Sequence, residues 1–240
     1  MAKKSDTMNN ISGKLNALQA FPTLKSLNAQ EFELIASKAI YNVCAKDTFI
    51  YKESQKASEM YFLVKGKVKL ASNTECGKTL IKEIVHADQL FGENIFQDQA
   101  IRSEYAITTE ADTQYLKVDK SVILELVYRN QAFSEDLMKL IMTRMNNLEQ
   151  RMKNFIFLKA KSRISEFIGR MGAQRGIRIG IDEWLINHGL SHKEIAYMTD
   201  TSRQTVARVL SELKQDDLIH FSARKPSKIL IRNIAALRMA

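Results

Sequence analysis

The spacing of apolar residues changes twice along the chain, and each spacing predicts a different structure. Residues 1–45 have the pattern of helices and loops, with an apolar patch at EFELIASKAI (31–40) and a break at Pro22. From about 48 to 118, short β-branched and aromatic runs recur: TFIY, MYFLVKG, KVKLAS, TLIKEIV, YAIT and TQYLKV. Three glycines separate these runs: Gly66, Gly77 and Gly92. Regular short strands predict an antiparallel sandwich or barrel, and the runs flanking NTECGK (73–78) predict a hairpin.

After Lys120 the spacing becomes helical. The run SVILELVYR (121–129) predicts a short helix, and Ser134 can cap a longer helix that follows. Apolar residues of the longer helix are alternately three and four positions apart: Met138, Ile141, Met145, Leu148, Met152 and Phe155. This heptad seam favours pairing with another helix, although a helix buried in its own domain has the same pattern. Because the seam lies between two otherwise complete domains, we expect a homodimer interface.

The rest of the chain alternates between helical and strand patterns. A helix is predicted by apolar residues at i, i+3, i+4 and i+7: Ile164, Phe167, Ile168 and Met171. Gly172 and Gly176 are expected to help end it. A strand is indicated by alternating apolar residues: Ile177, Ile179 and Ile181. The segment LIHFSARKPSKILIRN (218–233) predicts two strands joined by a basic turn that contains Arg224, Lys225, Pro226 and Lys228.

Two short helices joined by a tight turn lie before that last pair of strands. Ser191 and Glu194 match an S-x-x-E capping box, so the first helix should begin at His192. The turn is Thr199-Asp200-Thr201, and either Thr201 or Ser202 can cap the second helix. One face of the second helix is apolar: Val206, Val209, Leu210 and Leu213. This arrangement predicts a helix-turn-helix, with an ordinary amphipathic hairpin as the alternative.

The charge distribution favours an anionic partner for the polar face of the second helix. The chain of 240 residues has a formal net charge of +9. From Leu158 onward there are 15 Lys and Arg against 8 Asp and Glu, so most of the positive charge lies in the C-terminal third. Arginine can bind guanine and glutamine can bind adenine through two hydrogen bonds each. We therefore expect double-stranded DNA as a partner and assign the contacts to Ser202, Arg203, Gln204, Arg208, His192, Lys193, Arg224 and Lys225.

The composition argues against several other classes of protein. The two cysteines, Cys44 and Cys76, are too few for a disulfide framework or a four-thiolate cluster and fit a reducing compartment. No apolar run approaches the roughly 18 residues of a spanning helix, and the first residues lack a signal-peptide core, so we expect a cytoplasmic protein without membrane contact. No phosphate-binding loop, nucleophile elbow or HExxH motif is present, so we expect no enzyme.

Two parts of the chain resemble a known family. The stretch HKEIAYMTDTSRQTVARVLSELKQDDLI is similar to the DNA-binding domain of the CRP/FNR family of bacterial regulators. The stretches YFLVKGKVKL and FGENIFQDQAIRS resemble that family's cyclic-nucleotide-binding-type β-roll. The resemblance spans about residues 25–232.

The resemblance implies an α+β fold with three parts. These are an effector-sensing, jelly-roll-like antiparallel β-roll (1–133), a dimerisation helix and hinge (134–157), and a winged helix-turn-helix (158–240). It implies a homodimeric transcription regulator that a small effector controls through the long helix, with RNA polymerase as a further partner. The alternative is a cyclic-nucleotide-binding signalling module whose C-terminal domain docks protein.

The family's reading head falls on SRQTVAR (202–208). Both arginines match, but Gln204 stands where the cAMP receptor branch has a carboxylate. A carboxylate only accepts from cytosine, whereas glutamine donates and accepts, so the target sequence can differ. Asp200 stands where the family usually has glycine in the turn, and aspartate tolerates a left-handed backbone better than most residues.

In the cAMP-binding branch, a Gly-Glu pair and a later Arg-Ser pair hold the nucleotide. These residue types fall on Gly92, Glu93, Arg102 and Ser103. The resemblance implies that Gly92 allows close approach of the phosphate, Glu93 accepts from the ribose hydroxyl, and Arg102 pairs with the cyclic phosphate beside Ser103. A cAMP-like cyclic nucleotide is therefore one candidate effector, and another small molecule is a second.

Three departures from the pattern of the cAMP-binding branch support a third interpretation, in which no ligand binds. The Gly-to-Arg spacing is one residue shorter than in the cAMP receptor protein. Glu104 follows Ser103 where a small residue is usual, and it could pair with Arg102 instead. Leu148 and Glu149 stand where that protein has a Thr-Ser pair that touches the base.

Other sensor chemistries have weaker support. An iron–sulfur sensor of the family would need four cysteines, and neither Cys76 nor His86 has a spacing specific for haem. His188 and His192 are four residues apart, but Gly189 and Ser191 lie between them at a helix start. We therefore expect no metal site.

Overall fold

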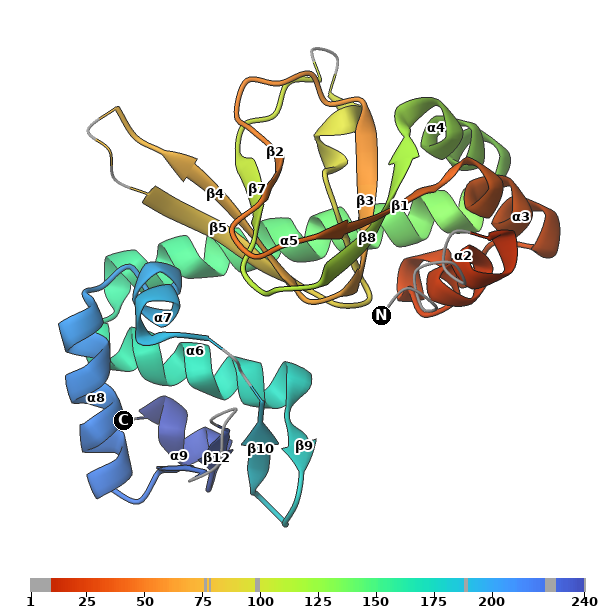
Figure 1. Ribbon diagram of the computed structural model, residues 1–240. Helices are drawn as coiled ribbons and strands as arrows, with labels where there is room; N and C mark the ends of the chain where they lie inside the picture. Colours follow the sequence, from red (N-terminus) through yellow and green to blue (C-terminus); the bar gives the residue numbers. More distant parts are fainter. Residues whose placement is uncertain are drawn as a thin grey trace. The chain divides into compact units, whose positions relative to one another are not determined.

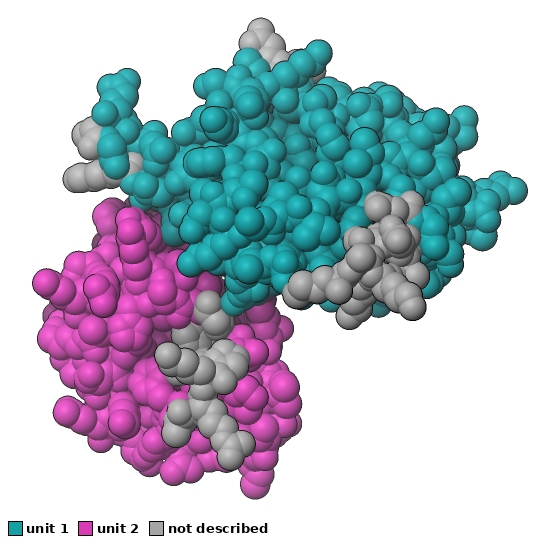
Figure 2. Space-filling view, viewed as in Figure 1, with its two compact units in different colours: residues 1–144 teal, residues 145–240 magenta. Residues whose placement is uncertain are grey.

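Two compact units make up the chain. The computed structural model describes residues 10–75, 77, 79–97, 100–187, 190–222 and 228–239. One unit comprises residues 1–144 and the other residues 145–240 (Figure 2). The long helix α5 (Gln131–Phe157) contributes its first half to one unit and the remainder to the other. None of the helices in the described ranges combines the length and apolar character needed to cross a membrane.

In the described residues of the first unit, eight strands form a β-roll, which Figure 1 draws in orange to green. They are β1 (Ile40–Cys44), β2 (Phe49–Tyr51), β3 (Glu59–Lys65), β4 (Lys67–Asn73), β5 (Thr79–His86), β6 (Gln89–Phe91), β7 (Tyr105–Thr108) and β8 (Thr113–Asp119). They pair in two antiparallel sheets, in the orders β1-β8-β3-β6 and β2-β7-β4-β5. The predicted antiparallel fold is confirmed, and so is the hairpin, which joins β4 to β5.

Both faces of strand β3 are buried, which explains its continuous apolar run. Met60 and Phe62 pack against helices in one core cluster, whereas Tyr61 and Leu63 point into the roll and belong to another. Side chains of a strand alternate between its faces, so a strand with two covered faces is apolar at every position. The covering helices and short 3₁₀ turns are α2 (Ile11–Leu18), η1 (Pro22–Leu24), α3 (Ala29–Lys38), η2 (Glu93–Phe96) and α4 (Lys120–Arg129).

Two expectations for the first unit are wrong. The apolar patch at 31–40 is not all helix, because α3 ends at Lys38 and Ile40 begins strand β1. Ser134 does not cap the long helix, because α5 already begins at Gln131. The side chain of Asn130 accepts from the Phe133 N–H at 2.9 Å, and the Ser134 hydroxyl lies inside the helix and donates to the Val127 carbonyl at 2.6 Å.

The second unit has the order of a winged helix-turn-helix. After α5, its elements are α6 (Ala160–Arg175), β9 (Ile177–Arg178), β10 (Trp184–Ile186), α7 (His192–Met198), α8 (Arg203–Gln215), β11 (Ile219–Phe221), β12 (Ile229–Ile231) and α9 (Ile234–Met239). The strands form one sheet in the order β11-β12-β10-β9. The predicted final pair of strands is confirmed as β11 and β12, which pair antiparallel.

Packing of α6 against the wing sheet explains one of its glycines. Gly172 does not end the helix as expected, because α6 continues to Arg175 and Gly176 is its C-cap. A Cβ on Gly172 would lie 2.7 Å from Cδ1 of Ile231, so the glycine lets the helix approach strand β12 closely. The strand expected at the alternating isoleucines is shorter than predicted, because β9 contains Ile177 but not Ile179 or Ile181.

Candidate functional site

The first helix of the helix-turn-helix begins as its sequence predicts. The Ser191 hydroxyl accepts from the Glu194 N–H at 3.2 Å, and the Glu194 carboxylate accepts from the Ser191 N–H at 2.7 Å. This reciprocal capping box starts α7 at His192. Ile195 and Ala196 are buried, so the small side chain of Ala196 lies on the packed face.

Helix α8 presents its polar face to solvent. Ser202 is its N-cap and accepts from the Thr205 N–H at 3.0 Å, so Thr201 is not the cap. The predicted apolar stripe is buried: Val206, Val209, Leu210 and Leu213. Arg203 and Gln204 are exposed and make no side-chain hydrogen bond or ion pair with any residue in the described ranges.

The remaining assigned DNA contacts differ in their surroundings. Arg208 is exposed and forms an ion pair with Glu212 one turn along α8. His192 and Lys193 are exposed on the first turn of α7, where the Lys193 ammonium lies 5.9 Å from the Tyr197 ring centroid. Arg224 and Lys225 of the wing lie outside the described residues.

Two arginines hold the turn between α7 and α8. Asp200 has a φ of 52°, the left-handed conformation expected for it. The Arg151 guanidinium donates to both carboxylate oxygens of Asp200, at 3.0 and 2.7 Å, and to the Tyr197 carbonyl at 2.7 Å. Arg163 donates to the carbonyls of Thr199 and Asp200, both at 2.8 Å. Neither arginine was predicted from the sequence.

In the β-roll, the four residues assigned to an effector lie around the turn into η2. Gly92 has a φ of 92°, and a Cβ there would lie 2.9 Å from Arg102 Nη1, so only glycine fits. Arg102 is buried and donates to the backbone carbonyls of Gly92 and Glu59. Its guanidinium carbon lies 4.2 Å from the Tyr51 ring centroid.

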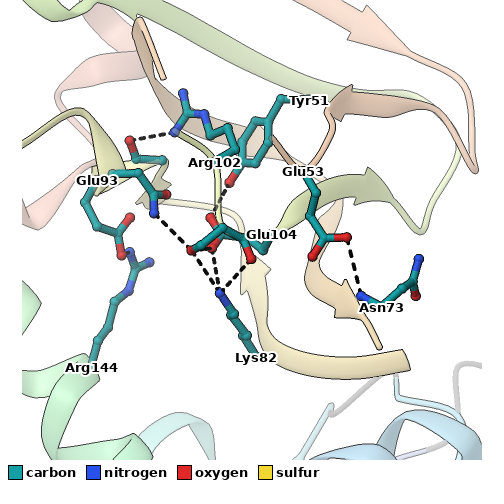
Figure 3. Close-up of polar contacts among 11 residues, drawn as sticks. Tyr51, Glu53, Asn73, Lys82, Glu93, Arg102, Glu104 and Arg144 are labelled. Carbon is teal, nitrogen blue, oxygen red and sulfur yellow. Dashed lines mark hydrogen bonds and ion pairs between the residues drawn. The ribbon is translucent and has the colours of Figure 1, made fainter. Parts of the chain in front are cut away.

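Glu104 has other partners than Arg102, so the Arg102–Glu104 pair considered as an alternative is not formed. The Lys82 ammonium lies 2.9 Å from the Glu104 carboxylate and 3.1 Å from the Ser103 hydroxyl (Figure 3). Ser103 and Tyr51 also donate to Glu104. Burial raises the pKa of Glu104, but the lysine and the two hydroxyl donors outweigh it and hold this pKa below its ordinary value.

Glu93 is bound by the long helix. Arg144 of α5 donates to the Glu93 carboxylate and, at 2.7 Å, to the Leu90 carbonyl (Figure 3). The Arg144 Nε atom also lies 3.1 Å from the Glu83 carboxylate. Burial lowers the pKa of Arg144, but the two carboxylates raise it by more, so this side chain stays a cation between two anions.

Aromatic rings fill the interior of the roll beside these polar groups. Tyr61 and Phe91 are stacked with their centroids 5.0 Å apart, and Tyr51 lies 5.4 Å from Tyr61. Tyr115 contacts Tyr61 edge to face at 5.8 Å. Burial, and to a smaller extent the neighbouring Glu59 carboxylate, raise the pKa of Tyr61 to about 12. These phenols therefore stay protonated at neutral pH.

Lys82 and Arg144 were missed for different reasons. Lys82 lies at a β-bulge, since Leu70 pairs with Glu83 and Ala71 with Ile81, and a bulge can direct its extra side chain out of the normal alternation. Nothing in the TLIKEIV run indicates this bulge. Arg144 lies between apolar seam positions and has the appearance of an ordinary solvated residue of that helix.

The predicted seam is exposed along α5. Its members are Met138, Ile141, Met145, Leu148, Met152 and Phe155, and each side chain is at least 38% accessible. Met142, Ile156 and Phe157 extend this apolar surface. Among the described residues, no three His, Cys, Asp or Glu side chains are grouped as metal ligands would be; Cys76 and His188 lie outside those residues.

Comparison with known proteins gives matches to both units. A model of the cyclic nucleotide-binding domain matches residues 42–130, and a model of the Crp-like helix-turn-helix domain matches residues 162–240. The cAMP-activated global transcriptional regulator CRP of Haemophilus influenzae is 26% identical over 73% of this chain and 77% of its own length. The anaerobic regulatory protein of Bacillus subtilis is 22% identical over 93% of both chains.

Solved structures share the fold. FixK2 from Bradyrhizobium japonicum has a TM-score of 0.72 and 20% sequence identity, covering 84% of this chain and 96% of its own. A CooA variant from Carboxydothermus hydrogenoformans has a TM-score of 0.71 and 19% identity, covering 85% and 88%. The predicted order of β-roll, long helix and winged helix-turn-helix is therefore confirmed.

Proposed function

Because the chain belongs to the CRP/FNR family of transcription regulators, we propose that it binds a specific DNA sequence as a homodimer and that the β-roll controls this binding through α5. The observation that carries the proposal is the polar face of α8. Arg203 and Gln204 stand exposed on the first turn of a capped helix, beside Arg208. Arginine and glutamine at this place can read guanine and adenine in the major groove.

The apolar surface of α5 supports the homodimer. Six heptad positions are exposed in the single chain, and a second copy of the helix would bury all of them. A two-fold axis along this seam would present two α8 helices to successive major grooves, about 34 Å apart. The DNA site would then be a near-palindrome, and RNA polymerase would be the further partner of the bound dimer.

The effector residues do not fit a cyclic nucleotide as they are arranged. Glu93 is bound by Arg144, Ser103 by Lys82 and Glu104, and Arg102 by two carbonyls. The cations around this site, Lys82, Arg102, Lys117 and Arg144, are matched by four carboxylates, those of Glu59, Glu83, Glu93 and Glu104. An added phosphate would therefore find no excess of positive charge, which disfavours its binding. We therefore include no nucleotide in the proposed control.

A binding experiment tests the proposal that the protein binds DNA. A duplex is selected by the wild-type protein from a random pool, and its affinity is measured over a range of salt concentrations. We expect a steep fall of affinity with salt, because phosphate contacts release counterions. A protein-docking module would bind no duplex at any salt concentration, and this result would contradict the proposal.

Calorimetry addresses the effector separately. Titration of the dimer with cAMP, cGMP or cyclic di-GMP should give no saturable heat. Saturable binding that is lost in Arg102→Gln would show that the contacts around Arg102 rearrange for a nucleotide. That result would refute the charge argument but leave the DNA-binding proposal intact.

A further inference from the structure

We infer that Arg151 is a positioning residue for DNA reading, which fastens the turn of the helix-turn-helix to α5 through Asp200. The inference rests on the proposed function, because it concerns how the reading helix is held. The ion pair lies inside the second unit and joins Arg151 to Asp200, which stands three positions before Arg203, the first residue of α8.

The contact has the geometry of a strong ion pair. The Arg151 Nε and Nη2 atoms donate to the two carboxylate oxygens of Asp200, and Nη2 also donates to the Tyr197 carbonyl. The side chains of Arg151 and Asp200 are only 13% and 25% exposed. A planar guanidinium that donates to both oxygens of a carboxylate fixes their relative orientation, which a lysine would not do.

Arg163 of α6 holds the same turn from its other side. It donates to the carbonyls of Thr199 and Asp200 and, at 2.8 Å, to the carbonyl of Leu158, just after α5 ends. The last carbonyls of a helix have no partner within that helix, and cations are favourable there. The end of α5, the start of α6 and the turn are thus joined by hydrogen bonds.

The backbone of Asp200 shows that the carboxylate matters. A φ of 52° suits glycine better than any other residue, because a Cβ is unfavourable in the left-handed region. The aspartate at this position has a carboxylate, which glycine lacks and which Arg151 binds. The chain contains a matched control at Asp217, where φ is 55° but the side chain is 68% exposed and contacts His220 on the surface.

Loss of the ion pair should affect sequence-specific and nonspecific DNA binding differently. Base contacts by Arg203 and Arg208 need a fixed direction of α8, whereas phosphate contacts tolerate a range of directions. A loosened turn should therefore lower affinity for the selected duplex and leave affinity for random duplex nearly unchanged. A merely structural role would instead lower both affinities by the same factor.

The test compares Asp200→Gly, Arg151→Gln, the double variant and Asp217→Gly in the full-length dimer. We expect each of the first two to weaken binding of the selected duplex roughly tenfold, about 1.4 kcal/mol, when measured well below the melting temperature of each variant. The double variant should be no weaker than Arg151→Gln, because the two residues act as one unit. Asp217→Gly should match the wild type within about twofold, as expected for a surface change.

Hydrogen exchange gives a readout that does not depend on DNA. The amide of Thr201 donates to the Ala196 carbonyl at 2.9 Å, and peptides covering residues 195–206 should exchange faster in Asp200→Gly and Arg151→Gln than in Asp217→Gly. Unchanged exchange and an unchanged ratio of the two DNA affinities would overturn the inference. If the wild type binds no duplex, the proposed function fails, and faster exchange in both variants alone would still establish that the pair holds the turn.

Discussion

In the first unit, Arg144 of α5 binds the carboxylates of Glu83 and Glu93, and in the second unit Arg151 of the same helix binds that of Asp200. Seven residues, about two helical turns, separate the two arginines. The polar residues of the two units differ in whether they are bonded within the protein. Around Arg144 every predicted effector residue is bonded within the protein, whereas on α8 Arg203 and Gln204 bond to no residue of the described ranges.

The contrast distinguishes charged side chains that are paired inside the fold from exposed ones that can bind another molecule. Burying a charge is costly unless it is paired, so Lys82, Arg102 and Arg144 must find partners inside the roll. An exposed arginine has no such need, because water solvates it until DNA replaces the water. Substitutions of the paired charges in the roll should therefore change the free energy of unfolding, whereas substitutions on the polar face of α8 should change DNA affinity.

The largest effect is expected from Arg144→Gln. Removing this cation breaks its ion pairs with the carboxylates of Glu83 and Glu93, which are only 29% and 28% exposed. Loss of one partner from a buried pair lowers the free energy of unfolding by about 3–5 kcal/mol. Because the carboxylates are partly exposed, we expect a loss of about 3 kcal/mol for this variant. Urea unfolding at neutral pH measures the loss. Arg129→Gln is the control, since Arg129 and Glu125 pair on the surface, and a loss no greater than in that control would contradict the role of Arg144.

The opposite pattern is expected for Arg203→Ala. The free energy of unfolding should change by less than about 0.5 kcal/mol, because the side chain is exposed and unpaired within the described ranges. Affinity for the selected duplex should fall by about 1–3 kcal/mol if the guanidinium reads a guanine. Binding of that duplex by fluorescence anisotropy measures the change. Lys214→Ala removes one positive charge from the last turn of the same helix and controls for charge alone; equal losses in the two variants would exclude base reading by Arg203.

The contrast also explains which features the sequence could predict. The stripe of α8, the capping box at Ser191 and the hairpin of β4 and β5 follow from short-range spacing, and all three are confirmed. The exposed face of α8 was equally accessible to prediction, because the direction of a helical side chain follows from its position in the turn.

Features that depend on distant contacts were missed. The short strands β1, β6 and β10 owe their pairing to neighbours elsewhere in the chain, and no local alternation marks them. The effector residues were identified by type, but their partners were not, because the bulge at Lys82 and the reach of Arg144 across to Glu93 are tertiary. A set of residue types indicates a site only when its members are not already bonded to one another.

The smallest expected effect is a change in stability with pH for Glu104→Gln, a substitution in the roll. Lys82, Ser103 and Tyr51 hold the pKa of Glu104 below its ordinary value of 4.5, although burial opposes them. A carboxyl group whose pKa is lowered on folding contributes stability above its unfolded pKa and loses it as pH falls through the folded pKa. Glu104→Gln should therefore be less stable than the wild type at neutral pH, by about 1 kcal/mol or less because Lys82 is 32% exposed, and the difference should shrink below about pH 4.5. Urea midpoints of both proteins across this range measure it, with Glu212→Gln on the exposed face of α8 as a control expected to show a smaller difference. A gap between Glu104→Gln and the wild type that widened on acidification would mean that Glu104 is strained by its burial rather than stabilised by Lys82, and the roll would then contain an unsatisfied charge after all.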